Sequence, residues 1–410
     1  MERAQRGPEP RKAAVTPKAH AVDMPWVRLK SAPAGPQAFK RMIANADPKA
    51  RPGDIVAVYD KNDAPYGAAL YNPKSLVTLR FLSRDLAGFN PAAFMKKMVC
   101  RAVSLRKDIL GLDATTDAYR VIHAHGDGLP GLVVDRYGDH LVLELYSLAM
   151  FRQAGAIAEA LQEHFPGAKV TLRASAPVQK MEGFSLKPKH GDAQPGGKVR
   201  VTENGVAFEV DLEGGYKTGF FCDQRENRLA AAGLARGRRM LDICSYTGGF
   251  GLYAKKLGGA EEVSCVELDP EASAQARRNA NLNNVRLDLV CADAFPYLRQ
   301  MAANRKTFGL VVLDPYKLIA TREGYDFGAH KYADFNRLAI AAVEEGGFFV
   351  TCSCSGLLPW HEFQRIVRSA AGSAGRKLQI FRKTGAGPDH PFAADFPEGE
   401  YLKVLWGRVF

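Results

Sequence analysis

The chain has 410 residues, of which 46% are hydrophobic and 24% charged, a composition that excludes long disorder as its main state. No apolar run reaches the roughly 18 residues of a membrane span and the N-terminus lacks a secretory h-region, so a cytoplasmic protein without membrane contact is expected. The net charge of +12 fits either a polyanionic partner or a merely solvated surface, and seven scattered cysteines disfavour a disulfide framework.

The first part of the chain contains three successive patterns. Residues 1–22 are basic and show no hydrophobic periodicity, which predicts a disordered tail. Residues 23–86 contain short alternating strands between turns, the pattern of a small β-rich domain. Residues 91–189 begin with a helical pattern at 91–110, continue with strands, and contain an amphipathic helix at 151–165. This third segment is predicted to be a central mixed β/α domain.

From residue 190 to residue 410 the pattern changes to apolar strands separated by helices. Helices are predicted near 252–257 and at 270–283, between strands that end in acidic residues. Such alternation is typical of a parallel, doubly wound sheet. The predicted fold class is therefore α/β, with a Rossmann-like C-terminal domain preceded by the β-rich domain and the mixed β/α domain.

A loop of small residues gives the strongest local signal for a ligand. A buried strand is expected to end in Asp242, the loop 245–249 follows, and a helix begins behind it, so backbone N–H groups can face a ligand. The next strand ends at Glu267, where an acid can accept hydrogen bonds from both hydroxyls of a ribose. Asp293 and Asp314 follow the third and fourth strands. All four acids are expected to line one edge of the sheet.

This arrangement favours S-adenosylmethionine over NAD, because an NAD enzyme is expected to carry a diphosphate-binding GxGxxG pattern. Asp293 is placed to meet the adenine amine, and Tyr246 to pack on the methionine portion. The alternative is that these acids only cap helices. The loop residues expected to bind the cofactor are Ser245, Tyr246, Thr247 and Gly248.

Another apolar strand runs to the same edge and ends in two thiols, Cys352 and Cys354. Cytosine C5 is a poor nucleophile until a thiolate adds to C6, whereas methylation of an amine needs no thiol. The strand end therefore indicates cytosine C5 chemistry, with Cys354 as the expected nucleophile and Cys352 as an inert thiol. Asp314 is the second catalytic candidate, because it can hydrogen-bond the N3/N4 edge of the base. Simple burial, a metal pair and a disulfide are the alternatives for the thiols, although the spacing of metal ligands is missing.

The chain resembles the RlmI-type 23S rRNA 5-methylcytosine methyltransferases from about residue 25 to residue 410. The matching blocks include PGDIVAVYD, HAHGDGLPGLVVDRYGDHLVLELYS, GGYKTGFFCDQRENR, LDICSYTGGF, SCSG and DHPFAADFPEGEYLK. The resemblance implies an N-terminal PUA domain, a central domain and a class I methyltransferase domain, with Cys354 as nucleophile. It also implies that Gln224 and Arg225 cover the cofactor or contact RNA. One departure is Tyr316, which stands where the family usually has a second proline after Asp314-Pro315, and whose ring is a candidate to stack on a flipped base.

Ribosomal RNA is the partner that the resemblance implies, since charge alone does not identify one. The side chains expected to track its phosphates are Lys96, Lys97, Arg101, Arg106 and Lys107 of one helix and the Lys-rich 180–200 segment. No metal is expected, and a homodimer stays open. Two other functions also stay open: methylation of a guanine or adenine nitrogen in RNA, which has no use for Cys354, and a non-catalytic role in RNA binding or ribosome assembly.

Overall fold

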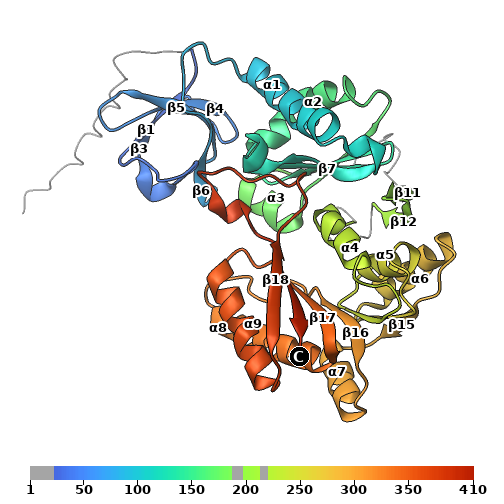
Figure 1. Cartoon of the computed structure of the whole chain (residues 1–410). Coiled ribbons are helices and arrows are strands. Elements are labelled where there is room, and N and C mark those ends of the chain that lie inside the picture. Colours follow the sequence, from blue (N-terminus) through green and yellow to red (C-terminus); the bar gives the residue numbers. More distant parts are fainter. Residues whose placement is uncertain (1–22, 187–196, 213–219) are drawn as a thin grey trace, which may run out of the picture.

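The computed structural model describes residues 23–186, 197–212 and 220–410 (Figure 1). The segment predicted to be a disordered tail, the expected domain boundary near residue 190 and part of the Lys-rich stretch lie outside the described residues. The described part contains an N-terminal sheet, a central sheet, a two-stranded hairpin and a large C-terminal sheet. Within it, none of the helices is long and apolar enough to cross a membrane.

The N-terminal sheet has the strand order β2-β6-β5-β4-β1-β3. Strands β1 and β4 pair in parallel, and the other neighbours pair antiparallel. Alternation along β4 buries both faces, because Val56 and Val58 join one core cluster while Ala57 and Tyr59 join another. The strands are β1 (Trp26–Leu29), β2 (Gln37–Phe39), β3 (Ile43–Ala46), β4 (Ile55–Tyr59), β5 (Pro65–Tyr71) and β6 (Val77–Ser83).

The central sheet has the order β10-β9-β8-β7 and shares one core with helices α1 and α2. Helix α1 begins at Pro91 because the side chain of Asn90 accepts a hydrogen bond from the Ala93 N–H at 2.9 Å. It ends at Ser104 and continues as a π-helical turn, Leu105–Ile109, where the sequence predicted more α-helix. The elements are α1 (Pro91–Ser104), β7 (Ala118–His123), β8 (Leu132–Tyr137), β9 (His140–Leu145), α2 (Leu148–Gln162), β10 (Lys169–Arg173) and α3 (Ala176–Glu182).

The hairpin of β11 (Lys198–Glu203) and β12 (Val206–Asp211) connects the central sheet to the C-terminal half. Its apolar side chains belong to a core cluster that also contains residues of both neighbours, among them Ala118, Tyr137, Val201, Phe208, Met240 and Leu252. Glu203 is fully buried there and accepts hydrogen bonds from Arg228 at 2.7 Å and from the Tyr253 hydroxyl at 2.8 Å. These partners make the buried carboxylate tolerable, so the central and C-terminal parts pack as neighbours with a common interior.

The C-terminal sheet has the order β15-β14-β13-β16-β17-β19-β18. The first five strands are parallel and β19 runs antiparallel to both of its neighbours, which confirms the Rossmann-like α/β fold. The chain direction of the crossovers reverses between β13 and β16, the point at which doubly wound sheets bind ligands. The strands are β13 (Arg239–Ile243), β14 (Glu262–Glu267), β15 (Asp288–Cys291), β16 (Phe308–Leu313), β17 (Val343–Ser353), β18 (Leu378–Thr384) and β19 (Lys403–Val409). The helices are α4 (Arg225–Ala232), α5 (Gly249–Lys256), α6 (Pro270–Leu282), α7 (Ala294–Ala303), α8 (Tyr325–Ala341) and α9 (Trp360–Ser373).

Residues 385–402, called the bridging segment here, join β18 to β19 and extend from the C-terminal sheet to the other two parts (Figure 1). The Asp389 carboxylate accepts a hydrogen bond from a backbone N–H of β7 at 3.0 Å. The ring of Phe396 stacks on His125, with 4.2 Å between the ring centroids. His125 in turn lies 3.2 Å from the side-chain nitrogen of Gln37 in β2. The bridging segment therefore connects the C-terminal sheet to the central sheet directly and to the N-terminal sheet through His125.

Candidate active site

The loop after β13 has a backbone geometry suited to a ligand. Cys244, Tyr246 and Gly248 have positive φ angles of 59°, 49° and 81°. Such angles are uncommon for residues other than glycine and persist mostly where a site needs them. They alternate with Ser245 and Thr247 just before α5 begins, so successive N–H groups can form a concave donor surface at the helix N-terminus.

Asp242 lies within β13 below this loop and is fully buried. Its Oδ2 accepts a hydrogen bond from the Gly251 N–H at 3.0 Å, which ties the strand to the first turn of α5. Burial raises the pKa of Asp242 to about 7. Gly251 allows this close packing, because a Cβ there would lie 2.5 Å from the Cys265 sulfur.

Glu267 and Asp293 lie at the ends of β14 and β15, the edge at which the sequence predicts them. Glu267 is half-buried and its carboxylate accepts hydrogen bonds from the N–H groups of Tyr246 at 2.7 Å and Leu268 at 2.9 Å. Asp293 is exposed and caps α7 by accepting a hydrogen bond from the Phe295 N–H at 2.8 Å. For Asp293 the observed contact is therefore that of a helix cap, the alternative given for these acids in the sequence analysis.

Asp314 follows β16 and faces Gln224, whose side-chain N–H donates to the carboxylate at 3.0 Å. Burial and the nearby Asp223 carboxylate raise the pKa of Asp314 to about 7. A narrow pocket separates this pair from the loop after β13. Its lining is Phe220, Phe221, Gln224, Arg228, Cys244, Ser245, Tyr246, Thr247, Gly249, Phe250 and Asp314. Four residues predicted to bind the cofactor are outside that lining: Asp242, Gly248, Glu267 and Asp293. The lining also contains residues that the sequence analysis did not single out, although they belong to a family block: Phe220, Phe221 and Arg228.

The pocket contains polar atoms that fit a ligand such as S-adenosylmethionine. Ser245 Oγ in its wall and Asp242 Oδ1 beneath it are buried and have no hydrogen-bond partner among the described residues. Buried polar atoms of native proteins are nearly always paired, so these two are available to a bound group. The rings of Phe221 and Tyr246 meet edge to face, with 5.1 Å between centroids, and supply an apolar wall.

Cys354 is the first residue after β17 and is half-buried, with its sulfur 4.0 Å from the Pro315 carbonyl oxygen. The fold thus brings Cys354 next to the loop that begins at Asp314. Cys352 is fully buried in the core, and this burial raises the pKa of its thiol well above the usual range. Tyr316 is 61% exposed beside the same loop. Of the two thiols, Cys354 alone is placed to reach a substrate.

A buried network fixes the backbone around Cys354. Ser353 donates to the Tyr332 hydroxyl at 2.9 Å, and the same hydroxyl lies 3.0 Å from Ser355 Oγ. Ser355 Oγ also accepts a hydrogen bond from the Ile319 N–H at 3.1 Å. The residues on both sides of Cys354 are therefore anchored to α8 and to the loop after β16. The sequence did not reveal this role of Tyr332, which lies inside an ordinary apolar helix pattern.

Two predictions about arginines are wrong. Arg106 was expected to bind phosphates, but it is fully buried and pairs with both carboxylate oxygens of Asp127 and with the Asp389 carbonyl. Arg225 was expected to cover the cofactor or contact RNA, but it is 1% exposed and makes two hydrogen bonds to Asp389. Both guanidiniums hold the bridging segment in place, and neither reaches solvent.

The doubly wound sheet and the ligand-binding loop at its switch point define an S-adenosylmethionine-dependent methyltransferase. The family model of that name matches residues 190–355, and a PUA-like domain model matches residues 35–84. Proteins named ribosomal RNA large subunit methyltransferase I are similar over nearly their whole length. The Klebsiella pneumoniae protein is 35% identical over 379 residues, covering 91% of this chain and 94% of that protein. The Vibrio cholerae protein is 36% identical over 381 residues, covering 91% and 95%.

The chain belongs to the ribosomal RNA large subunit methyltransferase I family, as the sequence resemblance predicted, and its cofactor is S-adenosylmethionine. The fold is also similar to that of an S-adenosylmethionine-dependent methyltransferase from Streptococcus mutans. That comparison gives a TM-score of 0.77 at 21% identity and covers 94% of this chain and 100% of the other. At 21% identity this similarity shows a shared fold.

Proposed function

We propose that this chain methylates C5 of a cytosine in 23S ribosomal RNA, with Cys354 as the covalent nucleophile and Asp314 as the second catalytic residue. The position of Cys354 carries the proposal, because its sulfur lies 4.0 Å from the carbonyl oxygen of Pro315, the residue after Asp314. A nitrogen methyltransferase needs no thiol at this point. The name of the relatives supports large-subunit ribosomal RNA as the substrate.

Cys354 makes C5 reactive by covalent addition. Its thiolate bonds to C6, and the electron pair of the C5–C6 double bond moves toward C5 and the N3/N4 edge. When bound, S-adenosylmethionine would supply C5 with an electrophilic methyl group from its sulfonium and would itself become a neutral thioether. Loss of the C5 proton to a base restores the C5–C6 double bond, and the bond between Cys354 and C6 breaks to release the thiolate.

Asp314 stabilises the charge that develops on the base. Its pKa of about 7 lets the carboxyl group carry a proton near neutral pH and donate a hydrogen bond toward N3. Gln224 holds the carboxyl group in place through the 3.0 Å hydrogen bond. We assign the cofactor to the loop after β13 and to the acids at neighbouring strand ends. The residues proposed to hold it are Asp242, Ser245, Tyr246, Thr247, Gly248, Glu267, Asp293, Asp314 and Gln224.

The remaining domains are proposed to hold the RNA. We assign residues 23–86 to a PUA-like RNA-binding domain, 91–189 to the central domain and 190–410 to the methyltransferase domain. The PUA-like match at residues 35–84 supports the first assignment. Lys97 and Arg101 are exposed on α1 and are proposed to contact phosphates.

The test is incubation with large-subunit ribosomal RNA and methyl-labelled cofactor, followed by nucleoside mass spectrometry and mapping of the modified position. The expected product is 5-methylcytidine. Cys354→Ala should lower the rate by about 1,000-fold or more while changing cofactor affinity by no more than about twofold. Cys100→Ala is the control and should keep the rate, because that half-buried thiol lies on α1 of the central domain beside His164.

Three results would contradict the proposal in different ways. Unchanged activity of Cys354→Ala would remove the thiol mechanism. A methyl group on a guanine or adenine nitrogen would favour the nitrogen methyltransferase. RNA binding with no methyl transfer would favour the role in ribosome assembly.

A further inference from the structure

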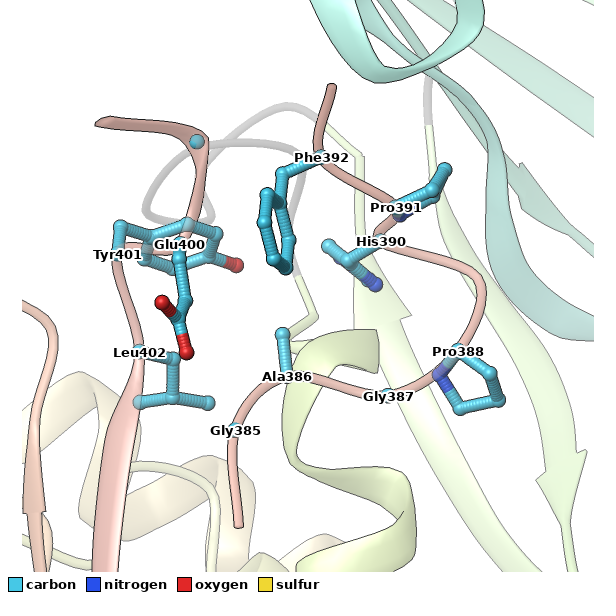
Figure 2. A pocket seen from close by; sticks show the side chains of 11 residues that line it. Gly385, Ala386, Gly387, Pro388, His390, Pro391, Phe392, Glu400, Tyr401 and Leu402 are labelled. Carbon is cyan, nitrogen blue, oxygen red and sulfur yellow. The ribbon is translucent and has the colours of Figure 1, made fainter. Parts of the chain in front are cut away.

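A cavity of about 460 Å³ lies on the bridging segment and has a different lining from the narrow pocket at the loop after β13. Figure 2 shows the residues around it, which are 385–388, 390–392 and 399–402. The volume lies in the range of pockets that hold small molecules. Phe392 is 48% exposed, and a Cβ at Gly399 would lie 2.8 Å from the Phe392 Cβ, so the two arms of the bridging segment meet at this ring.

Main-chain contacts connect the cavity wall to the elements that carry the two proposed reaction partners. On one side, Gly387 in its wall donates a backbone hydrogen bond to the Asp223 carbonyl at 2.8 Å. The next residue is Gln224, which holds Asp314. On the other side, the wall residue Leu402 is followed by the first residue of β19, which pairs with the residue before Cys354. The wall of the cavity is therefore joined to the residue before Gln224 on one side and, through Lys403, to the residue before Cys354 on the other.

Glu400 is the acidic group of this wall. Its Oε1 accepts a hydrogen bond from the Trp360 indole N–H at 2.9 Å, and it has no other hydrogen bond among the described residues. Lys403 is 2% exposed, donates to the Tyr401 carbonyl at 2.8 Å, and interacts electrostatically with both Glu400 and Cys354. Lys403 thus links the carboxylate in the cavity wall to the proposed nucleophile.

The rings and the carboxylate match the chemistry of one base. Single-stranded RNA bases that leave their stack are bound on aromatic faces, and Phe392 and Tyr401 supply such faces in the wall. Cytosine carries an N4 amino group that donates hydrogen bonds, and a carboxylate is the acceptor that proteins use for it. Uracil carries an acceptor oxygen at the same position, so a carboxylate disfavours it.

We propose that this cavity receives the target cytosine after it leaves the RNA stack, with Phe392 stacking on the base and Glu400 accepting a hydrogen bond from N4. This inference rests on the proposed cytosine C5 function and adds the residues that select the base. Phe392 sets affinity for any pyrimidine at the site, and Glu400 sets the preference for cytosine over uracil.

The test uses the full chain, S-adenosylmethionine and a short RNA around the mapped position, with 5-fluorocytidine or 5-fluorouridine there. Fluorine replaces the C5 proton that must be lost before Cys354 is released. The covalent adduct therefore accumulates, and its amount is measured on a denaturing gel. Phe392→Ala should slow adduct formation with 5-fluorocytidine about tenfold or more. Glu400→Gln should reduce the rate ratio of 5-fluorocytidine to 5-fluorouridine about tenfold, because glutamine both donates and accepts.

The controls separate this proposal from the function on which it rests. Phe381→Ala removes a ring of similar exposure, 50%, on β18, and Glu398→Gln changes an exposed acid of the same segment that is outside the cavity lining. Both should behave like the wild type. If the wild type forms the adduct, while Phe392→Ala keeps the rate and Glu400→Gln keeps the base preference, the cavity assignment alone is overturned. Failure of the wild type to form either an adduct or 5-methylcytidine overturns the proposed function and this inference with it.

Discussion

Single buried acids shape both the site and its response to pH. Asp242 is fully buried, makes one hydrogen bond to the Gly251 N–H and faces Asp314, Glu267 and Arg228. Burial raises the pKa of Asp242 in the folded state to about 7. Between about pH 4 and pH 7 the native protein therefore keeps a proton on this carboxyl group that the unfolded chain has lost. The stabilising effect of that proton is complete below the unfolded pKa of about 4 and disappears as the pH rises toward 7.

Asp242→Asn should therefore become more stable relative to the wild type as the pH rises. We expect the difference in the free energy of unfolding to shift in favour of the variant by up to about 4 kcal/mol between pH 4 and pH 8. Denaturant unfolding at several pH values measures it. Asp334→Asn, which changes an exposed acid on α8, should show no such trend. A constant difference across this range would contradict the argument.

For single residues, the sequence predicted the positions of those that follow apolar strands. It did not predict the positions of residues whose hydrogen-bond partners lie far away in the chain. Cys354 and Asp314 could be found because a strand end fixes their edge of the sheet. Arg106 and Arg225 were misassigned because their partner, Asp389, lies 283 and 164 residues away in the chain. A local pattern shows that a residue is charged, but it does not show whether the charge is paired and buried.

At the level of secondary-structure elements, the position of the bridging segment depends on its close approach to the turn after β7. Gly126 lies after β7 in η4 (Ala124–Asp127), and a Cβ there would lie 1.9 Å from the Pro391 carbonyl oxygen. The main chain of the bridging segment can hold its position because glycine has no side chain. The antiparallel pair β18–β19, which carries the segment, was not predicted either, since its apolar residues give no sign of direction or of the sheet order.

Gly126→Ala should displace the bridging segment. We expect a loss of about 1–3 kcal/mol in the free energy of unfolding, with a fall in methyl transfer that exceeds the change in cofactor affinity. Thermal unfolding, a transfer assay and cofactor titration measure the three quantities. Gly155→Ala is the matched control, because Gly155 is exposed inside α2 with open space at its Cβ. That variant should be about 0.5–1 kcal/mol more stable and fully active.

Across the whole molecule, a buried charge network holds the parts together. Asp389 is fully buried in the bridging segment, pairs with Arg225 at 2.9 Å and with His390 at 3.1 Å, and its carbonyl accepts a hydrogen bond from Arg106 of the central domain. Burial alone would raise the pKa of Asp389, but His390 and Arg225 hold it far below its usual range. The ionised carboxylate is thus part of the contact between the domains.

Asp389→Asn should cost about 3–5 kcal/mol in the free energy of unfolding at pH 7, because it leaves the buried Arg225 guanidinium without the buried carboxylate that pairs with it. The depressed pKa means that this contribution is present above the unfolded value of about 4 and declines as the pH falls below it. The gap between variant and wild type should therefore be smaller at pH 3 than at pH 7 in denaturant unfolding. Asp395→Asn, an exposed acid of the same segment, should stay within about 0.5 kcal/mol of the wild type. A gap that is equal at both pH values would show that the ion pair does not contribute.

The position of β19 also determines when the site can form during translation. This strand follows every other strand of its sheet in the chain, yet it pairs with β17 next to the nucleophile and ends the bridging segment. A nascent chain can fold its earlier domains while synthesis continues. It cannot complete the site until β19 has left the ribosome. The part of the site beside Cys354 is therefore completed only after the other strands of the sheet have been synthesised.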